Sequence, residues 1–282
     1  MITRRNFLQT AALATAGGAM MTMPETTSAK QKIKSPGIQL YTVRNELGKD
    51  FEGTLKSVAA LGYKEFEFFG NYYGKSPTEV KALLTSLGVT APAGHFALAA
   101  LNADVNKVID TAKAVGHGIV ICPFLMPNER KTLDDYKKLC ATLNKSGEAC
   151  KKAGLMFGYH NHDFEFEELE GKLPYDLILS ECDKNNVKME MDLGWISYAG
   201  KDPLPYFAKY PGRFITFHVK DMDASQKQKT MELGRGKVNF QRILAKSKQA
   251  GVKHYFVEQD NTSLTALESI KISMDYLKKL EF

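Results

Sequence analysis

Ionisable side chains recur at one kind of position in this sequence, the end of a short apolar run. Seven of them could do chemistry there: His95, His160, His162, Asp192, His218, Lys220 and Glu258. Imidazole nitrogens and carboxylate oxygens are ligands for Mn²⁺, Co²⁺, Fe²⁺, Zn²⁺ or Mg²⁺ in proteins. Burying so many ionisable groups without a cation would cost on the order of several kcal/mol each. The pattern therefore suits a bound divalent metal ion.

The apolar runs alternate with helical patterns along the chain. Eight runs have the length and composition of strands: 37–42, 64–69, 90–96, 118–124, 155–162, 187–193, 214–220 and 253–259. Helical patterns lie between them, for example Phe51–Leu61, Pro77–Leu87 and Leu133–Ala153. Several of these patterns end at a glycine, such as Gly62 or Gly116, where a left-handed helix C-cap is needed. Because the strands are apolar on both faces and alternate with helices, they predict a covered parallel sheet.

Eight such units in about 250 residues predict a (β/α)8 TIM barrel. An open, doubly wound sheet is the alternative, but the first run is not followed by the G-x-G-x-x-G of a dinucleotide site. In a barrel, functional groups gather at the carboxyl ends of the strands. The polar residues at the run ends are therefore expected to face one site.

The composition excludes several classes of protein. The chain has 282 residues, 44% hydrophobic and 25% charged, which is typical of a globular protein and not of a disordered or fibrous one. Its formal charge of +6 is spread among acids, so no nucleic-acid-binding stripe is expected. The four cysteines form no C-x-x-C and are expected to be free thiols.

The first 29 residues are typical of an export signal. Arg4 and Arg5 precede an uncharged stretch rich in Ala, Gly and Met, and Thr27-Ser28-Ala29 offers a cleavage site. We expect residues 1–29 to be a twin-arginine signal peptide and residues 30–282 to be the barrel domain. The mature protein would then be periplasmic. It would have no stable membrane span, because the apolar run is short.

Six motifs of the mature chain stand at its strand candidates. They are Gly37-Ile-Gln-Leu-Tyr41, Gly62-Tyr-Lys-Glu-Phe-Glu67, Gly158-Tyr-His-Asn-His162, Asp192-Leu-Gly194, His218-Val-Lys-Asp221 and Gly234-Arg-Gly-Lys-Val238. With these motifs the chain resembles the sugar isomerase/epimerase family of xylose isomerase-like barrels, which includes ketose 3-epimerases and inosose dehydratases. The pair formed by Asp192-Leu-Gly194 and His218-Val-Lys-Asp221 is the most specific part of the resemblance.

The resemblance implies one divalent metal ion held by residues of strands five to eight. Carried over to this sequence, the ligands are His160, Asp192, His218 and Glu258. The family's strand-five ligand is usually a glutamate followed two residues later by histidine. This chain has histidine at both positions, so the first ligand stays open among His160, His162 and Glu165.

The resemblance also implies removal of a proton next to a sugar carbonyl. Glu258, His160 or His162 would act as the base, and Lys220 or His95 would polarise or protonate an oxygen. Residues expected to bind the substrate are Gln39, Tyr41, Arg44, Glu67, Glu165 and Trp195. The Gly234–Val238 segment could be a phosphate-binding loop, but we expect it to be a plain loop without a bound phosphate.

The predicted function is a metal-dependent isomerase or epimerase acting on an unphosphorylated sugar or keto-sugar. Since the second ligand glutamate of the epimerases is replaced by histidine, a 3-keto-glycoside lyase or hydratase of the same fold is a competitor. A metal-free periplasmic carbohydrate-binding protein is the alternative from another class. An apurinic endonuclease of this superfamily would need more metal ligands and a basic face. The sequence leaves the oligomeric state open and admits a homo-oligomer.

Overall fold

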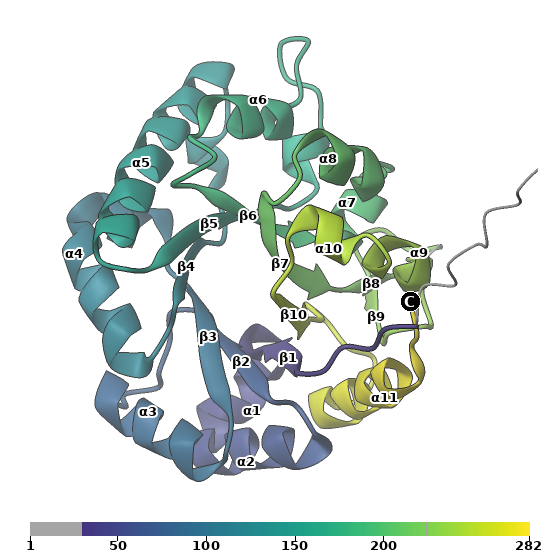
Figure 1. Cartoon of the computed structure of the whole chain (residues 1–282). Helices are drawn as coiled ribbons and strands as arrows, with labels where there is room; N and C mark the ends of the chain where they lie inside the picture. Colours follow the sequence, from purple (N-terminus) through teal and green to yellow (C-terminus); the bar gives the residue numbers. More distant parts are fainter. Residues whose placement is uncertain (1–29, 224) are drawn as a thin grey trace, which may run out of the picture. The chain divides into compact units, whose positions relative to one another are not determined.

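The structure is a computed structural model that describes residues 30–223 and 225–282. The predicted signal segment lies outside the described residues, so it stays a prediction. Residues Gln31–Phe282 form one compact unit. Its eight main strands are parallel and close into a barrel in the order β1-β10-β7-β6-β5-β4-β3-β2 (Figure 1). The predicted (β/α)8 barrel is confirmed.

Each barrel strand overlaps one predicted run. The strands are β1 (Pro36–Gln39), β2 (Glu65–Phe68), β3 (Thr90–His95), β4 (Ile119–Cys122), β5 (Met156–His160), β6 (Lys188–Asp192), β7 (Phe214–Val219) and β10 (His254–Val257). The first run was expected to continue to residue 42, and this was wrong. Gln39 ends β1 because its side-chain oxygen accepts a hydrogen bond from Tyr41 N at 3.1 Å, which starts the 3-10 turn η1 (Leu40–Val43). Two short antiparallel strands of two residues each, β8 (Asp221–Met222) and β9 (Thr230–Met231), follow β7.

Helices connect the strands and cover the barrel. They are α1 (Arg44–Lys49), α2 (Phe51–Leu61), α3 (Pro77–Ser86), α4 (Leu98–Val115), α5 (Leu133–Lys152), α6 (Pro174–Glu181), α7 (Leu193–Tyr198), α8 (Pro203–Lys209), α9 (Phe240–Leu244), α10 (Ser247–Ala250) and α11 (Ala266–Lys279), with short turns η2 (Pro127–Glu129) and η3 (Phe164–Phe166). Their ends follow from local chemistry. Ser76 and Glu79 form a capping box at α3, and Gly62 ends α2 with a φ of 111° that favours glycine.

The core has an apolar shell and a polar centre. A large cluster of buried apolar residues joins the strands to the helices, and a smaller one contains Ile119, Ile121 and Phe256. Alternate residues of each strand face the barrel interior, so Glu258 shares that face with Phe256. The four cysteines are buried and free, as expected. In the described part of the chain, none of the helices has the length and apolarity needed to cross a membrane.

One buried histidine in the shell makes stability depend on pH. His117 Nδ1 lies 2.7 Å from Ala91 O, which it can only reach as a donor, and Tyr72 OH lies 3.1 Å from Nε2. Burial lowers the pKa of His117 from 6.5 to about 4, although the bond to Ala91 opposes this. The neutral ring therefore stabilises the fold fully above pH 6.5. This contribution is lost as the pH falls towards 4.

We expect the free energy of unfolding to fall by up to about 3 kcal/mol between pH 7 and pH 4 through His117 alone. His117→Gln should lower stability at pH 7 by about 1–2 kcal/mol, because it disturbs one buried and one partly buried hydrogen bond. It should also flatten the dependence on pH. Urea unfolding of both proteins from pH 4 to 7 tests this, and parallel curves would contradict it.

Candidate active site

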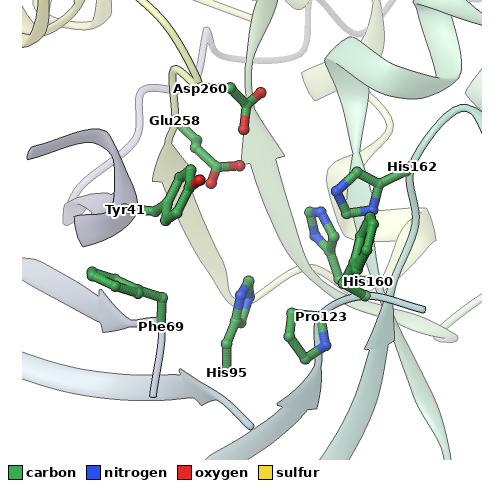
Figure 2. A pocket seen from close by; sticks show the side chains of 9 residues that line it. Tyr41, Phe69, His95, Pro123, His160, His162, Glu258 and Asp260 are labelled. Atoms are coloured by element: carbon green, nitrogen blue, oxygen red, sulfur yellow. The ribbon is translucent and has the colours of Figure 1, made fainter. Parts of the chain in front are cut away.

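A cavity of about 350 Å³ opens where the barrel strands end (Figure 2). Its lining residues come from η1 and from the ends of β2, β3, β4, β5 and β10. They are Tyr41, Phe69, His95, Pro123, Phe124, His160, His162, Glu258 and Asp260. Four of the seven strand-end residues that drew attention in the sequence line this cavity: His95, His160, His162 and Glu258.

The four residues implied as metal ligands come together beside this cavity. His160 ends β5, Asp192 ends β6, His218 lies in β7, and Glu258 follows β10 directly. Each offers one donor atom, and the four atoms lie within 4.8 Å of one another. All four residues are buried. Among the three candidates for the strand-five position, His160 is the one that the structure brings into this set.

The other two candidates point elsewhere. Glu165 is fully buried, and its carboxylate accepts hydrogen bonds from Tyr159 OH at 2.5 Å and from His162 N at 2.8 Å. Glu165 does not line the cavity, where the sequence placed it as a substrate-binding residue. His162 lines the cavity outside the four-residue set.

The donor set suits a divalent cation. Asp192 Oδ2 is buried and receives no well-aligned hydrogen bond, although Lys220 Nζ lies 2.9 Å away. Burial raises the pKa of Asp192, while Lys220 and His218 act to lower it. A buried carboxylate oxygen without a hydrogen bond is a ready ligand, and two imidazoles with two carboxylates fit transition metals such as Zn²⁺, Fe²⁺ or Mn²⁺.

A second layer of carboxylates lies beneath the set. His218 Nε2 is 2.7 Å from Glu67 Oε2 and 3.1 Å from Glu190 Oε2, whereas Nδ1 is 2.7 Å from Glu258 Oε2. Only one ring nitrogen of a neutral imidazole carries a proton. If Nδ1 faces a cation, Nε2–H can donate to Glu67, which fixes the tautomer and the ring orientation.

Sequence reasoning assigned Glu67 to substrate hydroxyls and did not single out Glu190. Both carboxylates are fully buried beneath the histidines. Glu190 could have been found, because it stands two residues before Asp192 on the same strand and therefore faces the same way. Its Oε2 lies 2.7 Å from His95 Nε2 and 3.1 Å from His160 Nδ1.

His95 and His160 differ in charge. Burial acts to lower the pKa of His95, but the Glu67 and Glu190 carboxylates raise it to about 9, so His95 is cationic at neutral pH. For His160, burial and the neighbouring His218 lower the pKa to about 3. A neutral His160 can donate a lone pair to a metal ion, whereas His95 balances the charge of the deep carboxylates.

Lys220 is a buried ammonium surrounded by carboxylates. Its Nζ lies 2.9 Å from Asp192 Oδ2 and 2.8 Å from both Glu258 Oε2 and Asp260 Oδ2. Gly194 makes room for it, because a Cβ there would lie 2.7 Å from Lys220 Cγ. This contact explains physically why the Asp192-Leu-Gly194 and His218-Val-Lys-Asp221 motifs occur together.

Of the predicted substrate-binding residues, Tyr41 is the one that lines the cavity. Gln39 lies deeper and donates to Glu67 Oε2 at 2.9 Å. Arg44 stands behind Tyr41, with its guanidinium carbon 4.0 Å from the ring centroid. Trp195 is 7% exposed, and its ring centroid lies 5.0 Å from Lys220 Nζ. It therefore packs against the ammonium and does not line the cavity.

The His162 ring is held by packing and not by a hydrogen bond through Nδ1. Its plane is stacked on Phe164 at 8°, and its buried Nδ1 has no hydrogen-bond partner in the described chain. Burial, followed by the nearby His160, holds the pKa of His162 well below its ordinary value. The ring is therefore neutral at pH 7, and packing holds it in place.

The loop at Gly234–Val238 is built around Asp221. The Asp221 carboxylate accepts hydrogen bonds from the backbone N–H of Met222, Gly234, Gly236 and Val238 at 2.9–3.0 Å. Four backbone donors that could have held a phosphate are thus already used. The loop is a structural clasp and fits the expectation of a loop without a ligand.

Gly236 should not tolerate a side chain. A Cβ there would collide with Asp221 Oδ1 and lie 2.5 Å from Met222 O. We expect Gly236→Ala to lower the free energy of unfolding by about 1–3 kcal/mol. Gly48→Ala is the control, because the nearest atom there is Tyr73 Cε1 at 3.6 Å, and it should be neutral or stabilising. Equal stability of the two variants in urea unfolding would contradict the clasp.

Comparisons with known proteins agree with the barrel fold. An inosose dehydratase from Clostridium perfringens is 28% identical over 221 residues, covering 69% of this chain and 71% of the relative. The crystal structure of a sugar phosphate isomerase/epimerase from Parabacteroides distasonis superposes with a TM-score of 0.76 at 25% identity, covering 89% of this chain and 94% of that chain.

A structure of an IolI protein with a zinc atom has the same fold, with a TM-score of 0.70 and 15% identity over 87% of this chain and 98% of that one. The family model described as xylose isomerase-like TIM barrel matches residues 55–280, which contain every residue of the four-residue set. The chain therefore belongs to the xylose isomerase-like TIM barrel family.

Proposed function

We propose that this chain is a divalent-metal-dependent lyase. It would remove a proton from the carbon next to a carbonyl of an unphosphorylated keto-sugar or cyclic keto-polyol and expel a group from the adjacent carbon. The observation that carries the proposal is the buried set of two imidazoles and two carboxylates beside a sugar-sized cavity. Similarity to an inosose dehydratase supports elimination as the reaction class.

His160, Asp192, His218 and Glu258 would hold the metal ion, and zinc in the similarly folded IolI structure supports a metal here. When bound, the ion would act as a Lewis acid and stabilise negative charge on the carbonyl oxygen. Glu67 would orient His218 towards the ion by accepting its Nε2 proton.

His162 is the residue that we propose as the base. Its ring lines the cavity, is neutral at pH 7 and makes no hydrogen bond through Nδ1. It can accept the proton from carbon and then return it to the leaving oxygen, so that water or an alcohol departs. The Glu258 carboxylate is less available as a base, because it belongs to the proposed metal-ligand set and already contacts Lys220 and His218.

An epimerase is the second candidate, because a relative at 25% identity bears that name. Epimerisation needs an effective acid/base group on each face of the sugar. Glu258 and His162 both line the cavity, but they differ in chemical type. The unequal pair favours elimination with one base.

The charge of the cavity favours a substrate without a phosphate group. Among the described residues that line it, none is Lys or Arg, whereas Glu258 and Asp260 are both acidic. A phosphate group would meet like charge there, and the cationic His95 of the lining is already paired with Glu67 and Glu190. Three backbone N–H groups of the Gly234–Val238 loop already donate to Asp221, and the other two donate to backbone carbonyls.

The test begins with protein purified without chelator and analysed for metals. Metal-loaded enzyme is then incubated in D₂O with an inosose or a 3-keto-glucoside and followed by NMR. We expect about one metal ion per chain and loss of water or of the glucoside's alcohol, with His162→Gln much slower at unchanged metal content. Deuterium exchange without loss of a group would favour the epimerase. No exchange by the metal-loaded enzyme would overturn the enzymatic proposal.

We also propose that the protein acts in the periplasm after export by the twin-arginine route. The support is the sequence of residues 1–29, with Arg4 and Arg5 ahead of an apolar stretch. N-terminal sequencing of the protein from a periplasmic fraction should find a chain that begins near residue 30. A Lys-Lys replacement of the two arginines should keep the uncleaved chain inside the cell.

A further inference from the structure

The mouth of the cavity has two aromatic walls that the proposed chemistry does not use. One wall is Tyr41 and Phe69, whose ring centroids are 5.5 Å apart in an edge-to-face arrangement. In Figure 2 these two residues lie across the cavity from Pro123 and His162. Phe124 belongs to the second side, because its ring centroid is 5.0 Å from that of His162. Two members of the buried donor set, His160 and Glu258, line the same cavity.

These rings are unusually exposed for their size. Large apolar side chains with more than a third of their surface exposed are few in the described chain: Tyr41 at 38%, Phe124 at 37%, Met126 and Leu264. Two of these four residues line the same cavity. Exposed aromatic surface that is concentrated in a concave site indicates contact with a ligand.

Both walls are held in place from behind. The Arg44 guanidinium lies over the Tyr41 ring and donates to Tyr41 O at 2.8 Å and to Asp260 O at 2.9 Å. On the other side, the Arg130 guanidinium lies 3.5 Å from the ring centroid of Phe164, and Phe164 packs edge-on against Phe124 at 5.6 Å. Rings that are fixed before binding lose little conformational entropy when a ligand arrives.

We propose that these walls form an outer subsite for a second ring, the aglycone of a glycoside whose reacting sugar lies on the donor set. This inference rests on the proposed function for the position of the reacting sugar. Within the lining, the polar groups suited to hydroxyls are concentrated at His95, His160, Glu258 and Asp260, whereas Tyr41, Phe69 and Phe124 offer mainly ring faces and edges. The chemistry they recognise is a ring with an apolar face, which an aromatic aglycone and a pyranose share.

Calorimetry on the metal-loaded protein tests the subsite without requiring turnover. The probes are methyl and phenyl glucosides, each as both anomers, together with maltose and cellobiose. We expect at least one ring-bearing glycoside to bind about tenfold more tightly than the matching methyl glucoside. Preference for the phenyl probes would assign an aromatic aglycone, and preference for the disaccharides would assign a second sugar.

Phe124→Ala should remove most of this preference and leave the affinity for methyl glucoside nearly unchanged. Met126→Ala is the matched control, since Met126 is 56% exposed two residues away and does not line the cavity. Equal affinity for methyl and ring-bearing probes, no binding of any probe, or a preference that survives in Phe124→Ala would overturn the subsite. Failure of the NMR experiment with the preference intact would refute the proposed reaction but keep the subsite.

Discussion

Asp192→Asn should lower the affinity for a divalent metal ion by more than about a hundredfold and leave the barrel folded. Loss of an outer-shell partner alone typically costs 10- to 100-fold in metal affinity, and Asp192 is placed as a direct ligand. The fold should survive, because Asp192 Oδ1 accepts a hydrogen bond from Trp195 N at 2.8 Å that an asparagine oxygen can also accept. Since burial raises the pKa of Asp192, removal of its charge should not destabilise the metal-free protein.

Elemental analysis and metal titration measure the affinity, and circular dichroism with urea unfolding measures the fold. His218→Ala should give the same loss of metal. Glu165→Gln is the matched control, because Glu165 is an equally buried carboxylate that bonds to Tyr159 and to His162 N outside the donor set. Stoichiometric metal in Asp192→Asn, together with its loss in Glu165→Gln, would refute the ligand set and restore the alternative that the sequence left open.

The fold was predictable because its signals are local and repeated. Each strand–helix unit has its own apolar run, and several of its helices have their own caps, such as Ser76 with Pro77 or the left-handed Gly62. The errors in the predicted strands were confined to the strand ends. Tyr41 belongs to a 3-10 turn because its backbone N–H donates to the Gln39 side chain instead of to a neighbouring strand. A pattern of apolar residues gives no sign of such a side-chain hydrogen bond.

The sequence predicts which residues of a strand face the barrel interior, because side chains alternate along a strand, but it does not predict how deep each of them lies. Position along the strands grouped Asp192 and Glu258 with the strand-end histidines, and the family resemblance implied which four residues form the ligand set. Depth and direction inside the barrel are decided by packing between distant strands. For this reason Glu67 was expected at the substrate, whereas it lies beneath His218, and the Phe124 wall was not anticipated.

Lys220→Met should destabilise the metal-free protein by about 3–5 kcal/mol at pH 8, the typical cost of removing one partner from a buried ionic cluster. Lys220 is fully buried, and its ammonium is within 2.9 Å of three carboxylates. Without it, the carboxylates repel one another: the pKa of Glu258, which the ammonium lowers, should rise, and the pKa values of Asp192 and Asp260, which burial already raises, should rise further. Protonation of these carboxylates relieves the repulsion at low pH and is lost as the pH rises, so the stability difference from the unsubstituted protein should be smaller at pH 5 than at pH 8.

A divalent metal ion should restore much of the lost stability, because it brings positive charge to Asp192 and Glu258, two of the three carboxylates that lose the ammonium. Urea unfolding at pH 5 and 8, with EDTA or with Mn²⁺, separates these effects. Lys188→Met is the matched control: Lys188 starts the same barrel strand as Asp192, and its pKa is lowered by burial and then by Arg213, so losing its charge should cost little. If Lys220→Met is no less stable than Lys188→Met in EDTA, the ammonium does not compensate the carboxylates. The charge balance of the site would then have to come from protonated histidines such as His95.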